Sequence, residues 1–474
     1  MQTKVVSPNV GNFVKSLRDI GYSMEVAVAD VLDNSIAANA SNINIYMVSE
    51  PELIFCMLDN GLGMDSEELV EAMRLATKDP ESSRAQTDLG RFGLGLKTAS
   101  FSQCKKLTVI SKKNGKISAQ QWDLDFISKE NKWLLITPDT RTIARLPLFS
   151  ELQNQDHGTL VVWQDIDGFS KNSLSDSIDN LRKHLSLVFH RFLEGIIGTK
   201  KLIVTVNNSP LKPFNPFNIN HPATQQLSSE KLKLHDETIL IQPFILPHHS
   251  KVSQQEYEQY ATEEGYTKSQ GFYLYRANRL LIYGTWWGLH RAIDAHKLVR
   301  VKIDITNNMD KYWRIDIKKS AANPNTVIKD DLKRIIRQTT EIGSRPYTGR
   351  GRKIEDKLTT KFWELDSLNG EIRFALNSEH PVLKKLITQL SDDNNELLHI
   401  YLKGLQAYLP LDAIQAQLQQ NPHKINQEAA LSKSEIISLA EKIKLSGLDN
   451  EFIDSLLKTE LFKNYKELLQ DGNK

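Results

Sequence analysis

The feature that most constrains this chain is an apolar stretch that stops abruptly at a glycine-rich turn. Residues 52–58 form a nearly continuous apolar run, typical of a buried strand, and Asp59–Met64 follows at once with Gly61 and Gly63. Glycines there permit backbone angles and close ligand approach that other residues resist. Asp59 can accept a hydrogen bond from an exocyclic amine, such as N6 of adenine. The other interpretation is a tight turn, which Asp-Asn-Gly favours.

A helix predicted before this strand carries a pair of polar residues. Residues 10–40 have apolar side chains at mixed three-and-four spacing, which indicates a helix. Asp30 and Asn34 are four residues apart and therefore share one face. The Asn34 amide oxygen suits Mg²⁺, which often takes only one or two protein ligands, and a carboxylate one turn away can activate water as a general base. A plain polar helix face, or a helix-end cap, is the alternative.

A second glycine-rich loop opens onto a helix predicted at 94–102. Its pattern is G-x-x-G-x-G, and such a loop presents backbone N–H groups to phosphate oxygens. It lacks the preceding strand and the later ribose-binding acid of the dinucleotide fingerprint. Lys97 either adds charge to the phosphates or is a solvated helix lysine. The residues assigned to phosphate binding are Gly90, Arg91, Phe92, Gly93, Leu94, Gly95 and Lys97.

The elements around these motifs predict an α+β fold. Strands are predicted at 42–48, 106–112, 116–124 and 158–164, with a short helix at 66–76 and a variable loop at 126–156. Helices and antiparallel strands in turn indicate an α+β sandwich. Thr159 stands at the start of one predicted strand, which is commonplace by itself.

Taken in order, these signals resemble the GHKL superfamily of ATPases, which includes gyrase B subunits, ninety-kilodalton heat-shock chaperones, histidine kinases, MutL and MORC proteins. The resemblance covers residues 12–170 and implies a Bergerat-type ATPase sandwich that binds ATP with Mg²⁺. It assigns Asn34 to the metal, Asp59 to adenine, and Lys78 to the base of a lid at 77–92. The other matched positions are Gly61, Gly63 and Met64 beside Asp59, the phosphate loop, and Thr159 in the last motif.

One position departs from this family, because Asp30 stands where the family usually places Glu. Aspartate is shorter by one methylene, so its carboxylate sits roughly 1.5 Å further back. Asp33 lies about 100° around the helix from Asn34, and Asp30 is therefore preferred as the general base. Two hypotheses follow: slow hydrolysis of ATP, and a nucleotide-gated binding module that hardly hydrolyses.

The region after the ATPase domain, which we place at 1–195, predicts a second α+β domain at 196–342. Its strands and a helix at 326–340 resemble the transducer domain of MutL, gyrase and MORC proteins. That resemblance implies a lysine that reaches back to the γ-phosphate. Lys318 and Lys319 both fit this role, and an exposed pair of strand-end lysines is the alternative.

The last two regions are a basic joint at 343–372 and a mostly helical region at 373–474. The joint contains glycine, proline and a basic cluster. This cluster is a candidate DNA contact or a solvated linker. Its members are Arg345, Arg350, Arg352 and Lys353.

The overall composition narrows the class of partner. Lys and Arg total 60 against 58 Asp and Glu, a net charge of +2, so bulk charge gives no argument for nucleic-acid binding. The two cysteines, Cys56 and Cys104, lie in apolar stretches and suit buried free thiols of a reducing compartment. No stretch approaches the roughly 18 apolar residues of a membrane span. We therefore expect a cytoplasmic protein with no membrane partner.

Within the superfamily, the segments around Asn34 and Gly90 most resemble prokaryotic MORC- and MutL-like ATPases. The resemblance implies lid closure and a nucleotide-dependent homodimer that forms a clamp, with DNA and proteins of restriction or anti-phage gene clusters as candidate partners. A chaperone-like clamp acting on protein clients is the alternative. A nuclease is disfavoured because His380, His399 and His423 have no metal-binding spacing.

Overall fold

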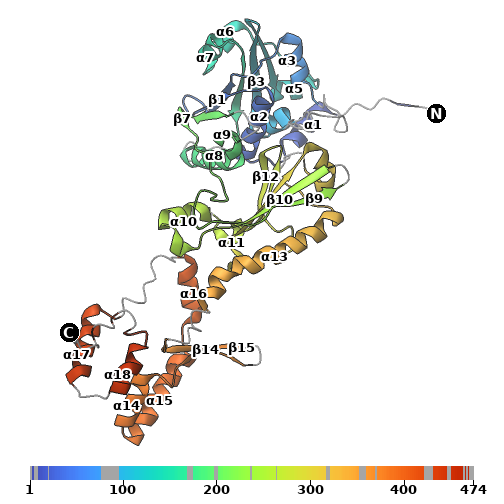
Figure 1. Ribbon diagram of the computed structural model, residues 1–474. Coiled ribbons are helices and arrows are strands. Elements are labelled where there is room, and N and C mark those ends of the chain that lie inside the picture. The colour runs from blue at the N-terminus through green and yellow to red at the C-terminus, as the bar shows by residue number, and fades with distance from the viewer. Residues whose placement is uncertain are drawn as a thin grey trace. The chain divides into compact units, whose positions relative to one another are not determined.

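The computed structural model forms two compact units (Figure 1). Unit 1 contains residues 1–247 and 259–340, and unit 2 contains residues 248–258 and 341–474. The residues that the structure describes are 3–4, 9–19, 21–75, 95–167, 174–196, 201–234, 237–262, 264–316, 321–351, 359–368, 371–420, 431–445, 450–462, 465 and 468.

Unit 1 contains a seven-stranded sheet in the order β4-β3-β5-β2-β1-β6-β7. Neighbouring strands are antiparallel except β1 and β6, which are parallel. Ile43, Ile45 and Met47 of β1 are buried, as the predicted alternation requires. The strands are β1 Asn42–Val48, β2 Ile54–Asp59, β3 Cys104–Lys113, β4 Lys116–Asp123, β5 Gly158–Ile166, β6 Ile203–Val206 and β7 Ser209–Pro210.

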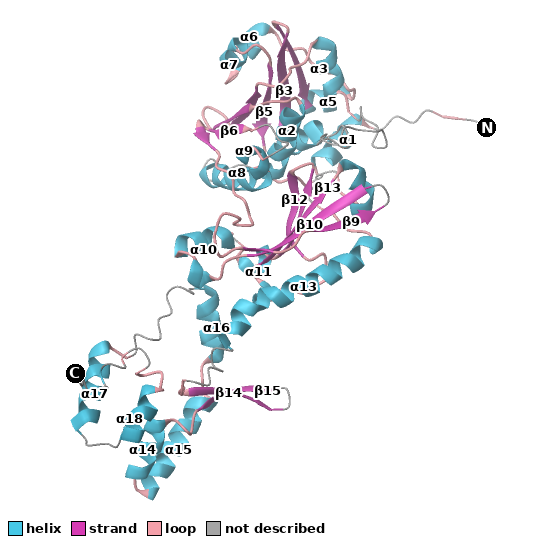
Figure 2. Ribbon diagram, in the orientation of Figure 1, coloured by secondary structure: helices cyan, strands magenta, loops and turns pink. Residues whose placement is uncertain are grey.

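Helices cover one face of this sheet around a shared apolar core (Figure 2). Nine residues of the central helix α2 are buried, because it lies between the sheet and the outer helices. The region predicted as one helical stretch at 10–40 is two helices, broken near Gly21, which has a φ of +79°. The helices are α1 Val10–Arg18, α2 Met24–Ala37, α3 Ser66–Met73, α4 Gly95–Gln103, α5 Leu124–Glu130, α8 Leu174–Val188 and α9 His190–Glu194.

The opposite face of the sheet is covered by part of the segment predicted as a loop. Ile143 of α6 (Thr140–Ile143) and Leu152 of α7 (Phe149–Asn154) pack with Leu58 and Leu160 in a second apolar cluster. The prediction of an irregular loop at 126–156 was therefore wrong, because these helices are too short to show a clear helical period.

A second, six-stranded sheet belongs to the same compact unit. Its order is β12-β11-β13-β10-β8, with β9 paired to β10. Strand β6 lies in the region 196–342 that was predicted to form the second domain, but it extends the first sheet by pairing with β1. The elements are β8 Gln225–Gln226, β9 Glu230–Leu234, β10 Glu237–Ile245, β11 Gly271–Arg276, β12 Arg279–Thr285, β13 Val299–Ile305, α11 Tyr266–Ser269, α12 Asp310–Trp313, and the 3-10 turns His249–Lys251 (in unit 2), Asp294–His296 and Asn307–Met309.

Two helices carry residues of both units: α10 (Gln254–Ala261) and α13 (Thr326–Gly351). Helix α13 runs eleven residues beyond the predicted end at 340, so the joint does not begin at 343. Glycine and proline rules for turns predicted a break there that the structure does not have. Of the basic cluster, Arg345 and Arg350 belong to this helix, whereas Arg352 and Lys353 lie outside the described residues.

Unit 2 is mostly helical, as predicted, but it also contains a hairpin of β14 (Trp363–Leu368) and β15 (Glu371–Leu376). Strand β14 lies inside the predicted joint, so that prediction was wrong at both ends. Ile436, Ala440, Leu456 and Phe462 form a small core. The helices are α14 Pro381–Gln389, α15 Asp392–Ala407, α16 Leu411–Gln420, α17 Lys433–Leu445 and α18 Asn450–Leu457.

Among the helices that the structure describes, none combines the length and apolarity needed to span a bilayer.

Candidate nucleotide-binding site

Helix α2 places Asn34 at the surface and Asp30 in the interior. The Asn34 amide nitrogen donates to the backbone carbonyl of Asp30, one helical turn back, at 3.1 Å. Because the amide nitrogen is engaged in this hydrogen bond, the amide oxygen is the atom that Asn34 presents to a ligand. Asp30 is only 2% exposed. The predicted pair therefore separates into an exposed carboxamide and a buried carboxylate.

Asp59 ends strand β2 with its carboxylate held on both oxygens. Oδ2 accepts from the Ser35 hydroxyl at 2.7 Å, and Oδ1 accepts from the Gly61 backbone N–H at 2.8 Å. Burial raises the pKa of Asp59 above its ordinary value, and these hydrogen bonds, together with the nearby His157, oppose the shift. Ser35 directly follows Asn34, so this hydrogen bond joins the candidate metal ligand and the candidate adenine acceptor in one site.

The two glycines after Asp59 are required by contacts within the protein. A Cβ on Gly61 would lie 2.8 Å from the Ala38 Cβ. Gly63 has a φ of +66°, and a Cβ there would lie 2.0 Å from the Lys112 carbonyl oxygen. Steric contacts within the protein therefore account for both glycines, and close ligand approach stays a prediction for these positions.

Ser111 of β3 ties together the ends of three neighbouring strands. Its hydroxyl accepts from the Met64 backbone N–H at 2.8 Å and lies 2.9 Å from the Thr159 hydroxyl. Thr159 is the register partner of Asp59 in the sheet. The structure thus brings Asp59, Met64 and Thr159 together, as the sequence predicted.

Sequence reasoning missed three polar residues of this site: Ser35, Ser111 and His157. His157 contacts the carbonyl oxygen of Gly61 through Nδ1. Ser111 and His157 are single polar residues outside any motif, so their spacing carries no signal. Ser35 had one available signal, namely its position directly after Asn34.

The phosphate-loop prediction is only partly described by the structure. Helix α4 begins at Gly95, and a Cβ there would meet open space. Lys97 is 3% exposed, and its ammonium donates to the Ala72 carbonyl at 2.9 Å, so it is not the solvated lysine of the alternative interpretation. Its phosphate role stays a prediction. Outside the described residues lie Lys78, Gly90, Arg91, Phe92, Gly93, Leu94, Lys318 and Lys319.

Asp30 lies in a buried polar cluster that the sequence did not reveal. The Tyr22 hydroxyl donates to Oδ2 of Asp30 at 3.2 Å, and Nη2 of Arg279 lies 3.4 Å from Oδ1. Asp33, which the helix angle had set aside, also belongs to this cluster, because its Oδ1 lies 3.0 Å from Nε of Arg279. Burial, and then the charge of Asp30, raise the pKa of Tyr22, so its hydroxyl keeps its proton.

Residues 22–159 match the family described as histidine kinase-, DNA gyrase B- and HSP90-like ATPases. This chain carries a GHKL-type ATPase domain. The matched range runs from Tyr22 to Thr159 and so encloses Asp30, Asn34 and Asp59. The expected α+β architecture and the superfamily are both confirmed.

Two curated relatives are MORC ATPases. Over 119 residues the chain is 32% identical to ATPase MORC2B of *Mus musculus*, which is 24% of this chain and 11% of the mouse protein. Over 109 residues it is 31% identical to ATPase morc-1 of *Caenorhabditis elegans*, which is 23% of this chain and 12% of the worm protein. The similarity therefore covers about a quarter of this chain and a small part of each relative's length.

The residues of the site fit ATP with Mg²⁺. Asn34 offers an exposed amide oxygen, the kind of hard ligand that Mg²⁺ accepts alongside phosphates and waters. Asp59 offers a buried acceptor whose position is fixed by Ser35 and Gly61.

Proposed function

We propose that this chain binds ATP together with Mg²⁺ in its GHKL domain and hydrolyses it slowly. The observation that carries the proposal is the Ser35 hydrogen bond to Asp59, which joins Asn34 and Asp59 within a segment that matches an ATPase family. Asp59 accepts from the adenine amine, and Asn34 ligates the metal. The glycine loop at 90–95 contributes backbone N–H groups to the phosphates. Mg²⁺ held by Asn34 would supply positive charge beside the phosphates.

Asp30 is the proposed general base for the attacking water. Its carboxylate removes a proton from the water as the oxygen attacks the γ-phosphorus, and ADP leaves with the electron pair of the broken P–O bond. In the structure the Asp30 side chain is fully buried beside Tyr22 and Arg279, so water must displace part of this packing to reach it. That requirement, together with the short aspartate side chain, supports slow turnover.

Phosphate release and ATP binding, measured on the same samples, test both parts of the proposal. Wild-type protein should bind ATP in Mg²⁺ and release phosphate, and EDTA should suppress both. Asn34→Ala should weaken binding about tenfold or more, because a metal ligand is lost. Phosphate release that is unchanged in both Asn34→Ala and Asp30→Ala would contradict the assignment of this site.

A nucleotide-gated binding module with little hydrolysis is the second candidate, and the burial of Asp30 favours it. It predicts Mg²⁺-dependent ATP binding with phosphate release at the buffer rate. Lid closure over bound ATP would then be the functional event, and the same pair of measurements separates the two candidates.

We further propose that ATP binding closes a lid and drives homodimerisation into a clamp, with Lys318 or Lys319 as the γ-phosphate sensor and the second sheet as part of a transducer-like domain. Support comes from the likeness to MORC ATPases. DNA, in a restriction or anti-phage system, is the proposed substrate of the clamp, and a chaperone-like clamp on protein clients is the alternative. Sedimentation velocity with ADP and with a non-hydrolysable ATP analogue, each with and without DNA, tests this proposal. A monomer under all four conditions would contradict it.

A further inference from the structure

The turn between β11 and β12 reaches from the second sheet into the core of the GHKL domain. Ala277 and Asn278 form this turn with φ angles of +47° and +69°, the left-handed pair of a tight hairpin. Ala277 packs against the apolar core of the first sheet. The Asn278 amide oxygen accepts from Nη1 of Arg191 in α9 at 3.2 Å. The surroundings thus hold an alanine in a conformation that it disfavours.

Arg279, the first residue of β12, extends from this turn to helix α2. Its side chain is 4% exposed, and it lies against two carboxylates: Oδ1 of Asp30 at 3.4 Å and Oδ1 of Asp33 at 3.0 Å. The guanidinium carbon lies 5.6 Å from the centre of the Phe189 ring. The only planar cation that reaches Asp30 among the described ion pairs therefore comes from the second sheet.

We propose that Arg279 is a positioning residue for Asp30, through which the second sheet sets the orientation of the proposed general base. This inference rests on the proposed hydrolysis of ATP. Arg279 and Tyr22 hold opposite oxygens of the Asp30 carboxylate, which fixes the plane of a side chain one methylene shorter than glutamate. A shift of the β11–β12 turn would move Asp30 with it.

Two other titratable side chains near this cluster, His184 and Tyr22, stay uncharged near neutral pH. Burial, with Arg279, lowers the pKa of His184 to about 4, so that this imidazole is neutral at pH 7. Burial and the charges of Asp30 and Asp316 raise the pKa of Tyr22, and the hydrogen bond with Thr98 lowers it. The net shift is upward, so Tyr22 keeps its proton. Asp33 shares the guanidinium with Asp30.

Arg276 provides a matched control for a purely structural role. It is the register partner of Arg279 in the same hairpin, and its side chain is 2% exposed. Its ion pair is with Asp310 of α12, at 2.6 and 2.8 Å. Arg276→Gln therefore removes a buried ion pair from this hairpin without removing the cation beside Asp30.

The test measures kcat and KM for ATP from pH 5 to 9, with calorimetric binding of Mg²⁺-ATP, for the full chain and its variants. Arg279→Gln should move the acidic limb of the kcat profile about one pH unit or more toward neutral, because an opposite charge has been lost. ATP affinity should stay within about twofold, since the Arg279 side chain is buried and the proposed site assigns it no nucleotide contact. Arg279→Lys should keep the acidic limb and lose kcat about fivefold, since an ammonium cannot bridge two carboxylates as a planar fork does. Arg276→Gln should lower the melting temperature and leave the limb in place.

An acidic limb in Arg279→Gln that coincides with that of wild type and Arg276→Gln would overturn the positioning role while leaving the proposed function intact. If Arg279→Gln does not fold, Arg279→Lys decides, and a wild-type kcat in that variant overturns the role. Wild-type protein that binds ATP but releases no phosphate would instead contradict the proposed hydrolysis, and the positioning role with it.

Discussion

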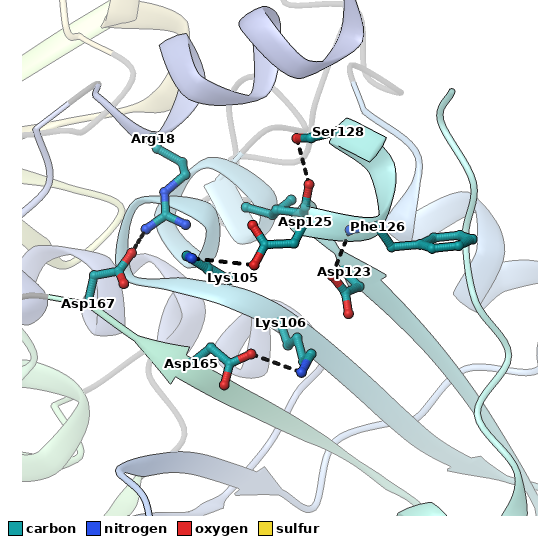
Figure 3. Close-up of polar contacts among 10 residues, drawn as sticks. Arg18, Lys105, Lys106, Asp123, Asp125, Phe126, Ser128, Asp165 and Asp167 are labelled. Carbon is teal, nitrogen blue, oxygen red and sulfur yellow. Dashed lines mark hydrogen bonds and ion pairs between the residues drawn. The ribbon is translucent and has the colours of Figure 1, made fainter. Parts of the chain in front are cut away.

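Two charged clusters in unit 1 differ in their exposure to water, and this difference separates local from long-range roles. The first is a surface strip (Figure 3), in which Arg18 of α1 pairs with Asp167, Lys105 of β3 with Asp125, and Lys106 of β3 with Asp165. The second is the buried cluster of Asp30, Asp33 and Arg279.

The strip joins β3 to its neighbouring strand β5 and to helix α5, and joins α1 to the residue that follows β5; its side chains are 19–72% exposed. Exposed ion pairs typically contribute about 0–1 kcal/mol. The buried cluster joins helix α2 to strand β12 of the second sheet, with Asp30 and Arg279 separated by 249 positions and side chains 0–4% exposed. Removing one partner of a buried pair leaves a charge without compensation. The buried cluster is therefore where the second sheet can influence the nucleotide site.

Loss of Arg279 should have the largest effect on stability. We expect Arg279→Gln to lower the free energy of unfolding by about 3–5 kcal/mol, because two buried carboxylates lose their guanidinium. Urea unfolding followed by circular dichroism measures this change. A loss no greater than that of Arg18→Gln in the strip would erase the distinction between the two clusters.

Loss of the Asp30 charge should have the next largest effect, on catalysis. We expect Asp30→Asn to reduce the rate of phosphate release about 100-fold or more, the usual contribution of a general base. Binding of Mg²⁺-ATP should change little, because Asp30 does not ligate the metal. Asp33→Asn is the control and should retain most of the rate. Equal losses in both variants would mean that the cluster acts as a unit and that Asp30 is not the specific base.

The pH dependence of stability tests the neutral state of His184 beside the buried cluster. Its native pKa, about 4, lies below the ordinary value of 6.5, so the unfolded chain binds more protons between these values. Stability from this group is thus complete above pH 6.5 and is lost as pH falls toward 4. We expect His184→Gln to flatten this loss by about 1–3 kcal/mol. If the change in unfolding free energy between pH 4.5 and 7 is equal in the variant and wild type, His184 does not have the lowered native pKa.

The surface strip should give the smallest effect. We expect Lys106→Gln to cost less than about 1 kcal/mol in the free energy of unfolding, because water and salt screen this pair. The cost should shrink further in 1 M salt, where the screening length is about 3 Å. A salt-independent loss as large as that of Arg279→Gln would show that the strip has a role beyond the surface.

Local patterns predicted much of the first sheet and of the nucleotide site. The alternation at 42–48 predicted the buried face of β1. The glycines after Asp59 marked positions where a Cβ would clash with Ala38 and Lys112.

The failures concern contacts that no local pattern encodes. The pairing of β6 with β1 joins segments about 160 residues apart, and the contact of Arg279 with Asp30 spans 249. Nothing in either segment marks its partner. Helix α13 shows a different limit, because the helix continues through a glycine- and proline-containing stretch that turn rules predict to break it.

The central claim, that Asp59 recognises adenine, is tested most directly by comparing ATP and GTP binding by calorimetry in Mg²⁺. Guanine has a carbonyl oxygen where adenine has its amine, so the Asp59 carboxylate would face a second acceptor. We expect wild type to bind ATP about tenfold or more tightly than GTP, and Asp59→Asn, which has nearly the same shape, to lose this preference. Equal affinity of wild type for ATP and GTP, or an unchanged preference in Asp59→Asn, would contradict the account.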